Sequence, residues 1–593
     1  MTNAGQLMTT DATSQARQGF ARWAELLAVA LVSAPFMFWN LGARYLWQDE
    51  AATAVLAERM FEYGRPLSYD GRNLITMDYP PLDDDEPPPP TDSAERAIEY
   101  FVQRGDFRAD TTWIGQPWGQ MVLAGLSLCA FGKSTLAARL PFAICGLLVV
   151  ILLWDALRQR FANLALRAAA LLLLLGNVFW VLHMRQCRYY APASLLLLGT
   201  FLAYLRWSEN QRFGLLVFVV AAFGLFQCDF GSFWPVIGVL ALDGARSFHG
   251  RRRELLMGFV ALACLVAPWV WYYQLFGRLK PRLAEFWASL AATIYNLNEY
   301  QFPLLAVGVL IPLVVLRRAR GLDTPRQTRF VLLATAVVGA VLLWMPVVTP
   351  FPFYRYLVGV TPLSCLVMGY VCAGIADWTF GADSTLDLRI ATVLPIAGLL
   401  VCTRAVTLPV DVPLQAALQW SREDDEPPQP ISLALFRPEL YALYVDLFDV
   451  GSDPNRDVID YLRPRLKPGD AVLINYEDIP LMFYTDAEIR GGIPAFRVED
   501  HSVPQPRFAV IRPQLTNQLQ PFYRELERHT WRRVPVEFEA WPWGNIPDPL
   551  YHRGRYLGTI VSHLDIFEAA SPQQGGLPFK APKDEEREIS SPR

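Results

Sequence analysis

Long apolar runs separated by short polar segments dominate the chain up to about residue 408. Several of these runs approach the roughly 20 residues that an α-helix needs to cross a bilayer. The pattern therefore predicts a polytopic α-helical membrane protein with about ten to twelve spans. The predicted spans are 23–40, 117–133, 136–154, 164–183, 190–206, 212–228, 231–243, 255–276, 302–317, 330–348, 354–376 and 389–408.

Composition agrees with this class and narrows the chemistry. Hydrophobic residues make up 53% of the chain and charged residues only 19%, which is low for a soluble protein. The eight cysteines lie in or beside apolar segments, which excludes a disulfide framework and a cysteine-based zinc site. The six histidines form no His-x-x-x-His pair. These counts identify no cofactor and leave a divalent cation as an open alternative.

Arginine and lysine indicate the orientation, because they are enriched in cytoplasmic loops. The N-terminal segment 1–22 and the connections near 158–167, 246–253 and 317–329 are rich in arginine. If these are inside, the loop 41–116 and everything after residue 408 are outside. We therefore expect a multi-pass protein of a bacterial plasma membrane with an extracytoplasmic C-terminal domain.

Two adjacent runs conflict with this orientation. Segments 117–133 and 136–154 cannot both cross the membrane if loop 41–116 is outside and the connection near Arg158 is inside. Either one run is partial or re-entrant, or the Arg158 connection violates the rule. The break at Gly132-Lys133-Ser134 is the expected place of the irregularity. The short run 231–243 raises a similar question.

The loop 41–116 is too long for a plain connection, so it should be functional or separately folded. It contains the acidic run 83–86, followed by four prolines. This composition is typical of an extended, solvated spacer, and a role in binding a divalent metal is the alternative.

After residue 408 the composition becomes that of a soluble domain. Helical and strand patterns alternate, which predicts a small α/β domain over residues 409–570. The membrane module would be 23–408, and the tail 571–593 is expected to be disordered. Expected helices begin near Asp453 and cover 479–484 and 515–528, and expected strands cover 471–474, 507–511 and 534–538.

An acidic pair, Asp49-Glu50, lies just after the first predicted span. A carboxylate at this place can accept a proton from an attacking hydroxyl or bind a metal. The alternative is that the pair marks a solvated membrane boundary.

Three arginines lie at predicted outer membrane edges, namely Arg185, Arg188 and Arg355. Arginine suits phosphate, to which it gives paired, charge-assisted hydrogen bonds, and a lipid headgroup could supply that phosphate. Snorkelling to the interface is the alternative for each of them. Asp229 interrupts an apolar stretch, so it is either a functional acid or a loop-end acid.

Five features in this order resemble the GT-C glycosyltransferases, such as protein O-mannosyltransferases and lipid A aminoarabinose transferases. These enzymes take a sugar from a polyprenyl-phosphate carrier. The fifth feature is the C-terminal α/β domain, and the resemblance covers about residues 20–490. The other four are Asp49-Glu50-Ala51; Gln116-Pro117-Trp118 with Phe131-Gly132 and Arg139-Leu140-Pro141; Arg188-Tyr189-Tyr190; and Tyr354-Arg355-Tyr356-Leu357.

The resemblance implies that Asp49 is the catalytic base, that Glu50 is its partner, and that Arg355 binds the carrier phosphate. Gln116 stands where the family usually has the histidine of a His-Pro-Pro motif. This departure, with a long insertion at 70–115, leaves the acceptor and any metal open. Gln116 and Asp229 are therefore candidates for contact with an acceptor or a metal.

The function expected from these observations is inverting glycosyl transfer from a polyprenyl-phosphate-linked sugar. The acceptor would be a hydroxyl of a lipid, glycan or protein at the outer face, and no nucleic acid is involved. One alternative is a lipid or glycan transporter or flippase, which would not account for the long outer loop and the outer domain. Another is a non-catalytic envelope assembly protein, in which Asp49-Glu50 would be structural.

Overall fold

The structure is a computed structural model of the whole chain. It describes residues 3–76, 88–247, 249–278, 286–300, 304–349, 354–380, 385–420, 435–437, 453–512, 519–540, 563–571 and 576–579. The acidic run 83–86 lies outside the described residues.

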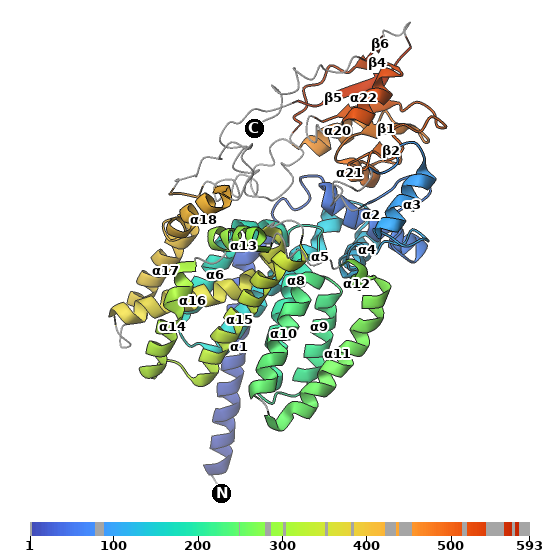
Figure 1. The fold of residues 1–593 in the computed structure, drawn as a ribbon. Coiled ribbons are helices and arrows are strands. Elements are labelled where there is room, and N and C mark those ends of the chain that lie inside the picture. The colour runs from blue at the N-terminus through green and yellow to red at the C-terminus, as the bar shows by residue number, and fades with distance from the viewer. Residues whose placement is uncertain are drawn as a thin grey trace.

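Helices form most of the described chain up to residue 420 (Figure 1). The first group is α1 (Asn3–Phe38), α2 (Gln48–Tyr63), α3 (Ala94–Arg104), α4 (Gly119–Phe131), α5 (Thr135–Arg160), α6 (Leu164–Gly176), α7 (Val178–Met184), α8 (Tyr190–Ser208) and α9 (Gly214–Phe226). The second group is α10 (Phe230–Ser247), η1 (His249–Arg251), α11 (Arg252–Tyr272), α12 (Leu275–Arg278), α13 (Phe286–Tyr300), α14 (Leu304–Ala319), α15 (Pro325–Val348), η2 (Tyr354–Val360), α16 (Thr361–Phe380), α17 (Leu386–Cys402) and α18 (Leu408–Trp420).

Several helices are long and apolar enough to cross a membrane. Among the described residues there are five by length and composition, or six if the bent pair α6 and α7 is one broken span. The five are Gly19–Phe38, Thr135–Arg160, Arg252–Tyr272, Pro325–Val348 and Arg355–Thr379. The expected class, a polytopic helical membrane protein with a C-terminal sheet domain, is confirmed, whereas the count of ten to twelve spans stays a prediction.

The conflict around 117–154 has a structural explanation. Helix α4 has 13 residues, which is too short to cross a bilayer, whereas α5 has 26. Gly132 adopts φ +82°, in the left-handed region that glycine tolerates, and Ser134 caps α5 by accepting from the Ala137 N–H. The break therefore lies at the expected place, and α5 alone has the length for a crossing.

The two ends of the helical part differ in character (Figure 1). The N-terminus and the connections α10–α11 and α14–α15 lie at one end, and the C-terminal domain lies at the other. Those two connections carry the basic segments 246–253 and 317–326. The positive charge of these two connections is thus remote from the C-terminal domain.

The C-terminal domain is built on one mixed sheet of six strands in the order β2-β1-β3-β5-β4-β6. Strands β1, β2 and β3 are parallel, and β3, β5, β4 and β6 pair antiparallel. The strands are β1 (Ala471–Ile474), β2 (Glu488–Gly491), β3 (Phe508–Ile511), β4 (Thr530–Arg533), β5 (Asp565–Ala569) and β6 (Leu577–Pro578), with helices α20 (Pro454–Leu462), α21 (Asp478–Tyr484) and α22 (Gln520–Glu527).

The buried apolar core is continuous between the two parts. A single cluster of buried side chains extends from Leu26 in α1 through the helices to Val472 and Ile489 in the sheet. The C-terminal domain therefore packs on the helical part rather than hanging from a linker.

Some details of the domain differ from the sequence predictions. The expected strand 534–538 is not formed, because β4 ends at Arg533 and Pro535 has no N–H to donate to a ladder. Strands β2, β4 and β5 were not predicted from the sequence. Strand β6 lies within the stretch expected to be a disordered tail, and residues 580–593 lie outside the described residues.

Candidate active site at the start of α2

Asp49 lies in the first turn of α2, where the positive end of the helix dipole favours a carboxylate. Its Oδ2 accepts from Arg188 Nη2 at 3.0 Å and from Arg355 Nη1 at 3.4 Å. The side chain of Asp49 is 20% exposed. Asp49, Arg188 and Arg355 are far apart in sequence, and all three were expected to be functional. Both arginines contact the same carboxylate oxygen.

Arg188 lies in the turn between α7 and α8, and its side chain is buried. Besides Asp49, it donates through Nη1 to Gln116 Oε1 at 3.1 Å and to Thr53 Oγ1 at 3.4 Å. Gln116 also accepts from Gln120 Nε2 at 3.0 Å. The guanidinium is therefore fixed by partners from α2 and from the segment that leads into α4.

Arg355 contacts the same carboxylate from η2. It is the first residue of Arg355–Thr379, the last described segment that is long and apolar enough to cross a membrane. Its side chain is 27% exposed, against 8% for Arg188. The ring of Tyr356 lies 5.7 Å from its guanidinium carbon. Arg355 is thus the more accessible of the two cations.

Glu50 differs from Asp49 in its burial and in its arginine partner. Its side chain is fully buried and forms a paired ion contact with Arg139 of α5, with Nε–Oε1 at 2.8 Å and Nη2–Oε2 at 2.6 Å. The same guanidinium donates to the carbonyl oxygens of Leu41, Arg44 and Tyr45 at 2.9–3.2 Å. Glu50 therefore anchors the start of α2 and does not face the place where Asp49 meets Arg188 and Arg355.

Glu50 also connects to the arginine turn. Its Oε1 accepts from the backbone N–H of Cys187 at 2.8 Å. Because Cys187 precedes Arg188, the same buried carboxylate orients both Asp49 and Arg188. These contacts are compatible with Glu50 acting as the partner of Asp49, and its catalytic role stays a prediction.

The remaining candidates lie at the margin of this cluster. Arg185 donates to the carbonyl oxygen of Trp39, the residue after α1. Asp229 accepts from the Gly231 N–H at 2.9 Å at the start of α10, and no contact with Asp49 is described. Gln116 joins the cluster through its contact with Arg188.

Within the described part of the chain, no group of three His, Cys, Asp or Glu side chains is arranged to hold a metal ion. The acidic run that could supply oxygen ligands lies outside that part.

The contact of Arg139 with Glu50 was not predicted from the sequence, although Arg139-Leu140-Pro141 belongs to one of the motifs above. An arginine inside an otherwise apolar run is a signal, because a buried cation needs a partner. Gln48, Thr53 and Gln120 carry no such signal, since a glutamine or threonine in a helix is unremarkable by itself.

The cluster of Asp49, Arg188 and Arg355 places a proton acceptor next to two cations. Asp49 can accept a proton, and Arg188 and Arg355 can bind an oxyanion through charge-assisted hydrogen bonds. These are the groups needed to activate a hydroxyl and stabilise a phosphate leaving group.

Comparison with known proteins supports this class. Residues 116–272 match the family model described as dolichyl-phosphate-mannose-protein mannosyltransferase. This segment includes Gln116, Arg139 and Arg188, whereas Asp49 and Arg355 lie outside it. Asp49 contacts Arg188 directly, and Arg355 contacts Asp49. The resemblance to GT-C glycosyltransferases expected from the sequence is confirmed by this family match over residues 116–272.

No curated protein matches the chain. Among solved structures, ArnT from Cupriavidus metallidurans in the apo state is 16% identical with a TM-score of 0.49, covering 85% of this chain and 95% of that chain. ArnT bound to undecaprenyl phosphate is 14% identical with a TM-score of 0.49, covering 92% and 98%. Arabinofuranosyltransferase AftD from Mycobacteria is 12% identical with a TM-score of 0.40, covering 93% and 40%. Similarity at this level carries no argument about the site.

Proposed function

We propose that this protein is an inverting glycosyltransferase that moves a sugar from a polyprenyl-phosphate carrier to an acceptor hydroxyl at the outer membrane face. The observation that carries the proposal is the meeting of Asp49, Arg188 and Arg355 at one point. A family match that includes Arg188 supports it. The acceptor would be a lipid, a glycan or a protein.

The reaction assigns each group a role. Asp49 takes the proton of the acceptor hydroxyl while that oxygen attacks the anomeric carbon. The bond between this carbon and the carrier phosphate breaks, and the phosphate leaves with the electron pair. Because attack and departure occur on opposite faces, the anomeric configuration inverts. Arg188 and Arg355 stabilise the charge that develops on the leaving phosphate.

A transporter is the main rival, and the buried ion pairs bear on it. Arg317, in the last turn of α14, pairs with Asp323 at 3.0 Å and also contacts Asp377 near the end of α16. These charges join helix ends and a turn rather than following a path along the helices. These ion pairs are therefore better explained as structural contacts between helices than as part of a transport route.

The accessible cation gives the first test. Arg355→Ala should weaken binding of a polyprenyl phosphate by about tenfold or more, because a hydrogen bond to a charged group contributes about 1.5–3 kcal/mol. Arg355→Lys should lie between the alanine variant and wild type, since lysine keeps the charge but loses the paired geometry. Binding of the carrier to purified protein in detergent measures both.

Arg65→Ala is the matched control. Arg65 is also an extracytoplasmic arginine in this proposal, and it makes an exposed ion pair with Asp110. Its removal should leave carrier affinity unchanged. Wild-type affinity in Arg355→Ala would remove Arg355 from the phosphate site, and an equal loss in Arg65→Ala would reduce the effect to general attraction of an anion.

The orientation gives a second test. We expect a reporter fused after residue 450 to be active only when exported, because the basic connections 246–253 and 317–326 lie at the end opposite the C-terminal domain (Figure 1). Paired fusions of alkaline phosphatase and a cytoplasm-specific fluorescent protein measure this. Activity of the cytoplasmic reporter alone would place the site on the wrong face and contradict the proposed reaction.

A further inference from the structure

Helix α2 carries Asp49 and is held at both ends by the C-terminal domain. At its start, Gln48 lies next to Asp49 and is buried. Gln48 Nε2 donates to Asp478 Oδ1 at 2.7 Å, and its Oε1 accepts from the Ile479 N–H at 3.3 Å. One side chain thus uses both sides of its amide to bind the first turn of α21.

Asp478 is built into its place. It is 5% exposed, and a Cβ added to Gly492 would lie 2.6 Å from its carboxylate oxygen. Gly492 also adopts φ +66°, a conformation that glycine tolerates. Burial raises the pKa of Asp478 to about 6, and the hydrogen bond from Gln48 acts in the opposite direction. The partner of Gln48 is therefore a fixed, desolvated carboxyl group.

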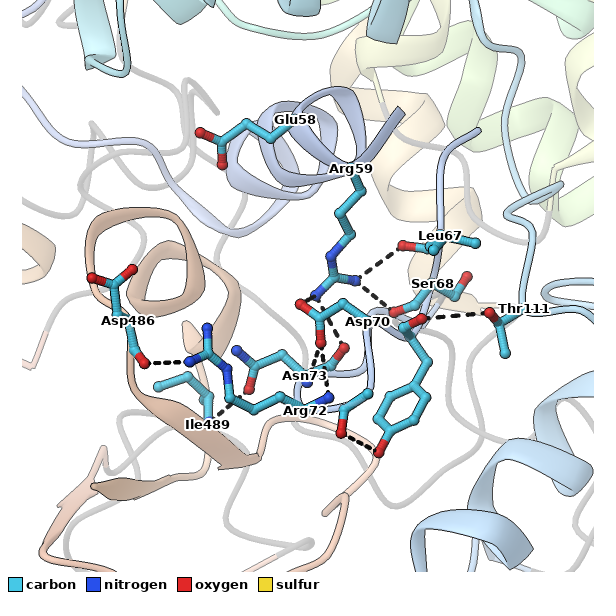
Figure 2. A network of polar contacts seen from close by, with 12 residues as sticks. Glu58, Arg59, Leu67, Ser68, Asp70, Arg72, Asn73, Thr111, Asp486 and Ile489 are labelled. Atoms are coloured by element: carbon cyan, nitrogen blue, oxygen red, sulfur yellow. Dashed lines mark hydrogen bonds and ion pairs between the residues drawn. The ribbon is translucent and has the colours of Figure 1, made fainter. Parts of the chain in front are cut away.

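A second link starts farther along α2, at Arg59 (Figure 2). Arg59 donates to the carbonyl oxygens of Leu67, Ser68 and Asn73 at 2.7–3.0 Å and to Asp70 Oδ2 at 2.6 Å. The segment after α2 is thereby folded back on the helix.

This folded segment carries Asn73 to the edge of the sheet (Figure 2). Asn73 Oδ1 accepts from the Ile489 N–H at 2.8 Å, and its Nδ2 donates to the Ala487 carbonyl oxygen at 3.2 Å. The side-chain amide thus pairs with the backbone at β2 as a neighbouring strand would. The far end of α2 is tied to the same domain as its start.

We propose that Gln48 and Asp478 are positioning residues through which the C-terminal domain fixes the Asp49 carboxylate for transfer. The inference rests on the proposed function, since it assigns Asp49 the role of base. Helix α2 is a strut between two attachments, and a small rotation at its first turn would move Asp49 away from the acceptor oxygen. Misplacement by about 1 Å can cost about 10²-fold in rate.

The test compares Gln48→Met, Asp478→Leu, the double variant and Asp478→Asn. Gln48→Met keeps the length of the side chain but removes both hydrogen-bonding groups, and Asp478→Asn keeps an acceptor. We expect kcat to fall by about 10- to 100-fold in the first two variants while KM for the lipid-linked sugar changes little. The double variant should be no worse than either single one, because both remove the same link. Asp478→Asn should retain most of the activity.

Gln103→Met is the matched control, because Gln103 is an exposed glutamine on α3. It should leave kcat and KM unchanged. The fraction of folded protein in each variant is taken from a thermal unfolding curve at the assay temperature. It separates a loss of Asp49 positioning from a loss of folded protein. A wild-type kcat in Gln48→Met, or a fall in kcat fully accounted for by unfolded protein, would overturn the inference.

Hydrogen exchange of the backbone amides in residues 48–53 gives a readout without catalysis. Exchange there should rise in Asp478→Leu but not in Gln103→Met, since the start of α2 loses its attachment. Unchanged exchange would overturn the positioning role even if activity fell. If wild-type protein transferred no sugar while exchange rose as expected, the attachment would stand and the proposed function would fail.

Discussion

Replacement of Asp49 by asparagine is expected to lower sugar transfer to about one percent of the wild-type rate or less. Asparagine keeps the size of the side chain and can still accept from Arg188, but it cannot take the proton of the acceptor hydroxyl. General-base assistance contributes about 10²–10⁴ in rate. Release of sugar from the lipid carrier by purified protein measures the effect.

Carrier binding makes this prediction sharper. Asparagine at position 49 leaves Arg188 and Arg355 in place and removes the carboxylate that both now contact. Binding of the carrier phosphate should therefore be retained while transfer is lost. Asp110→Asn, a change in an exposed carboxylate of the same outer region, should affect neither. Transfer at the wild-type rate in Asp49→Asn would show that α2 does not carry the base.

Replacement of Arg139 by methionine is expected to destabilise the whole protein. It leaves the Glu50 carboxylate buried without its ionic partner and releases the carbonyl oxygens of Leu41, Arg44 and Tyr45. Removal of one partner of a buried ion pair costs about 3–5 kcal/mol. Thermal unfolding in detergent, followed by the fraction of monodisperse protein, should show a large loss.

Two further variants identify the cause. Glu50→Gln should also destabilise, because it removes the charge that compensates Arg139. Arg96→Met breaks an exposed pair with Asp92, and such a pair contributes about 0–1 kcal/mol, so its stability should be near wild type. If Arg139→Met unfolded at the wild-type temperature, the pair with Glu50 would not anchor α2.

The contrast between Asp49 and Glu50 shows where sequence reasoning stops. The two acids were expected to act together, because the resemblance to GT-C glycosyltransferases implies that Glu50 is the partner of Asp49. On an α-helix, however, consecutive side chains point roughly 100° apart. One acid can therefore face the arginines while the other faces the protein interior. Which one does so depends on Arg139, a partner 89 residues away.

The arginines show the opposite case. Arg188 and Arg355 were identified from their position at membrane edges, and the structure brings both to Asp49. Arg185 was identified by the same argument and instead contacts Trp39. The position of a residue along the chain predicts how deep in the membrane it lies. The direction in which the Arg185 and Arg188 side chains point depends on the turn between α7 and α8, which the sequence pattern does not show.

The fold was predictable to a similar degree. Apolar runs identify most helices, and the alternating pattern after residue 453 identifies β1, β3 and α20. Strand β5 escaped because its antiparallel pairing with β3 joins segments more than 50 residues apart. Nothing in a five-residue stretch shows between which strands of the sheet it will lie.

The link between Gln48 and Asp478 has a consequence for the time course of biosynthesis. The two residues are 430 positions apart, so the ribosome makes Asp49 long before it makes the domain that holds it. At about 5–20 residues per second, the interval is roughly 20–90 s. During this time the nascent protein is in the membrane with Asp49, the proposed base, not yet held by the C-terminal domain. In the proposed function, a chain that stops before the C-terminal domain would insert its helices and still lack transferase activity. Competence would then come only after that domain has been made.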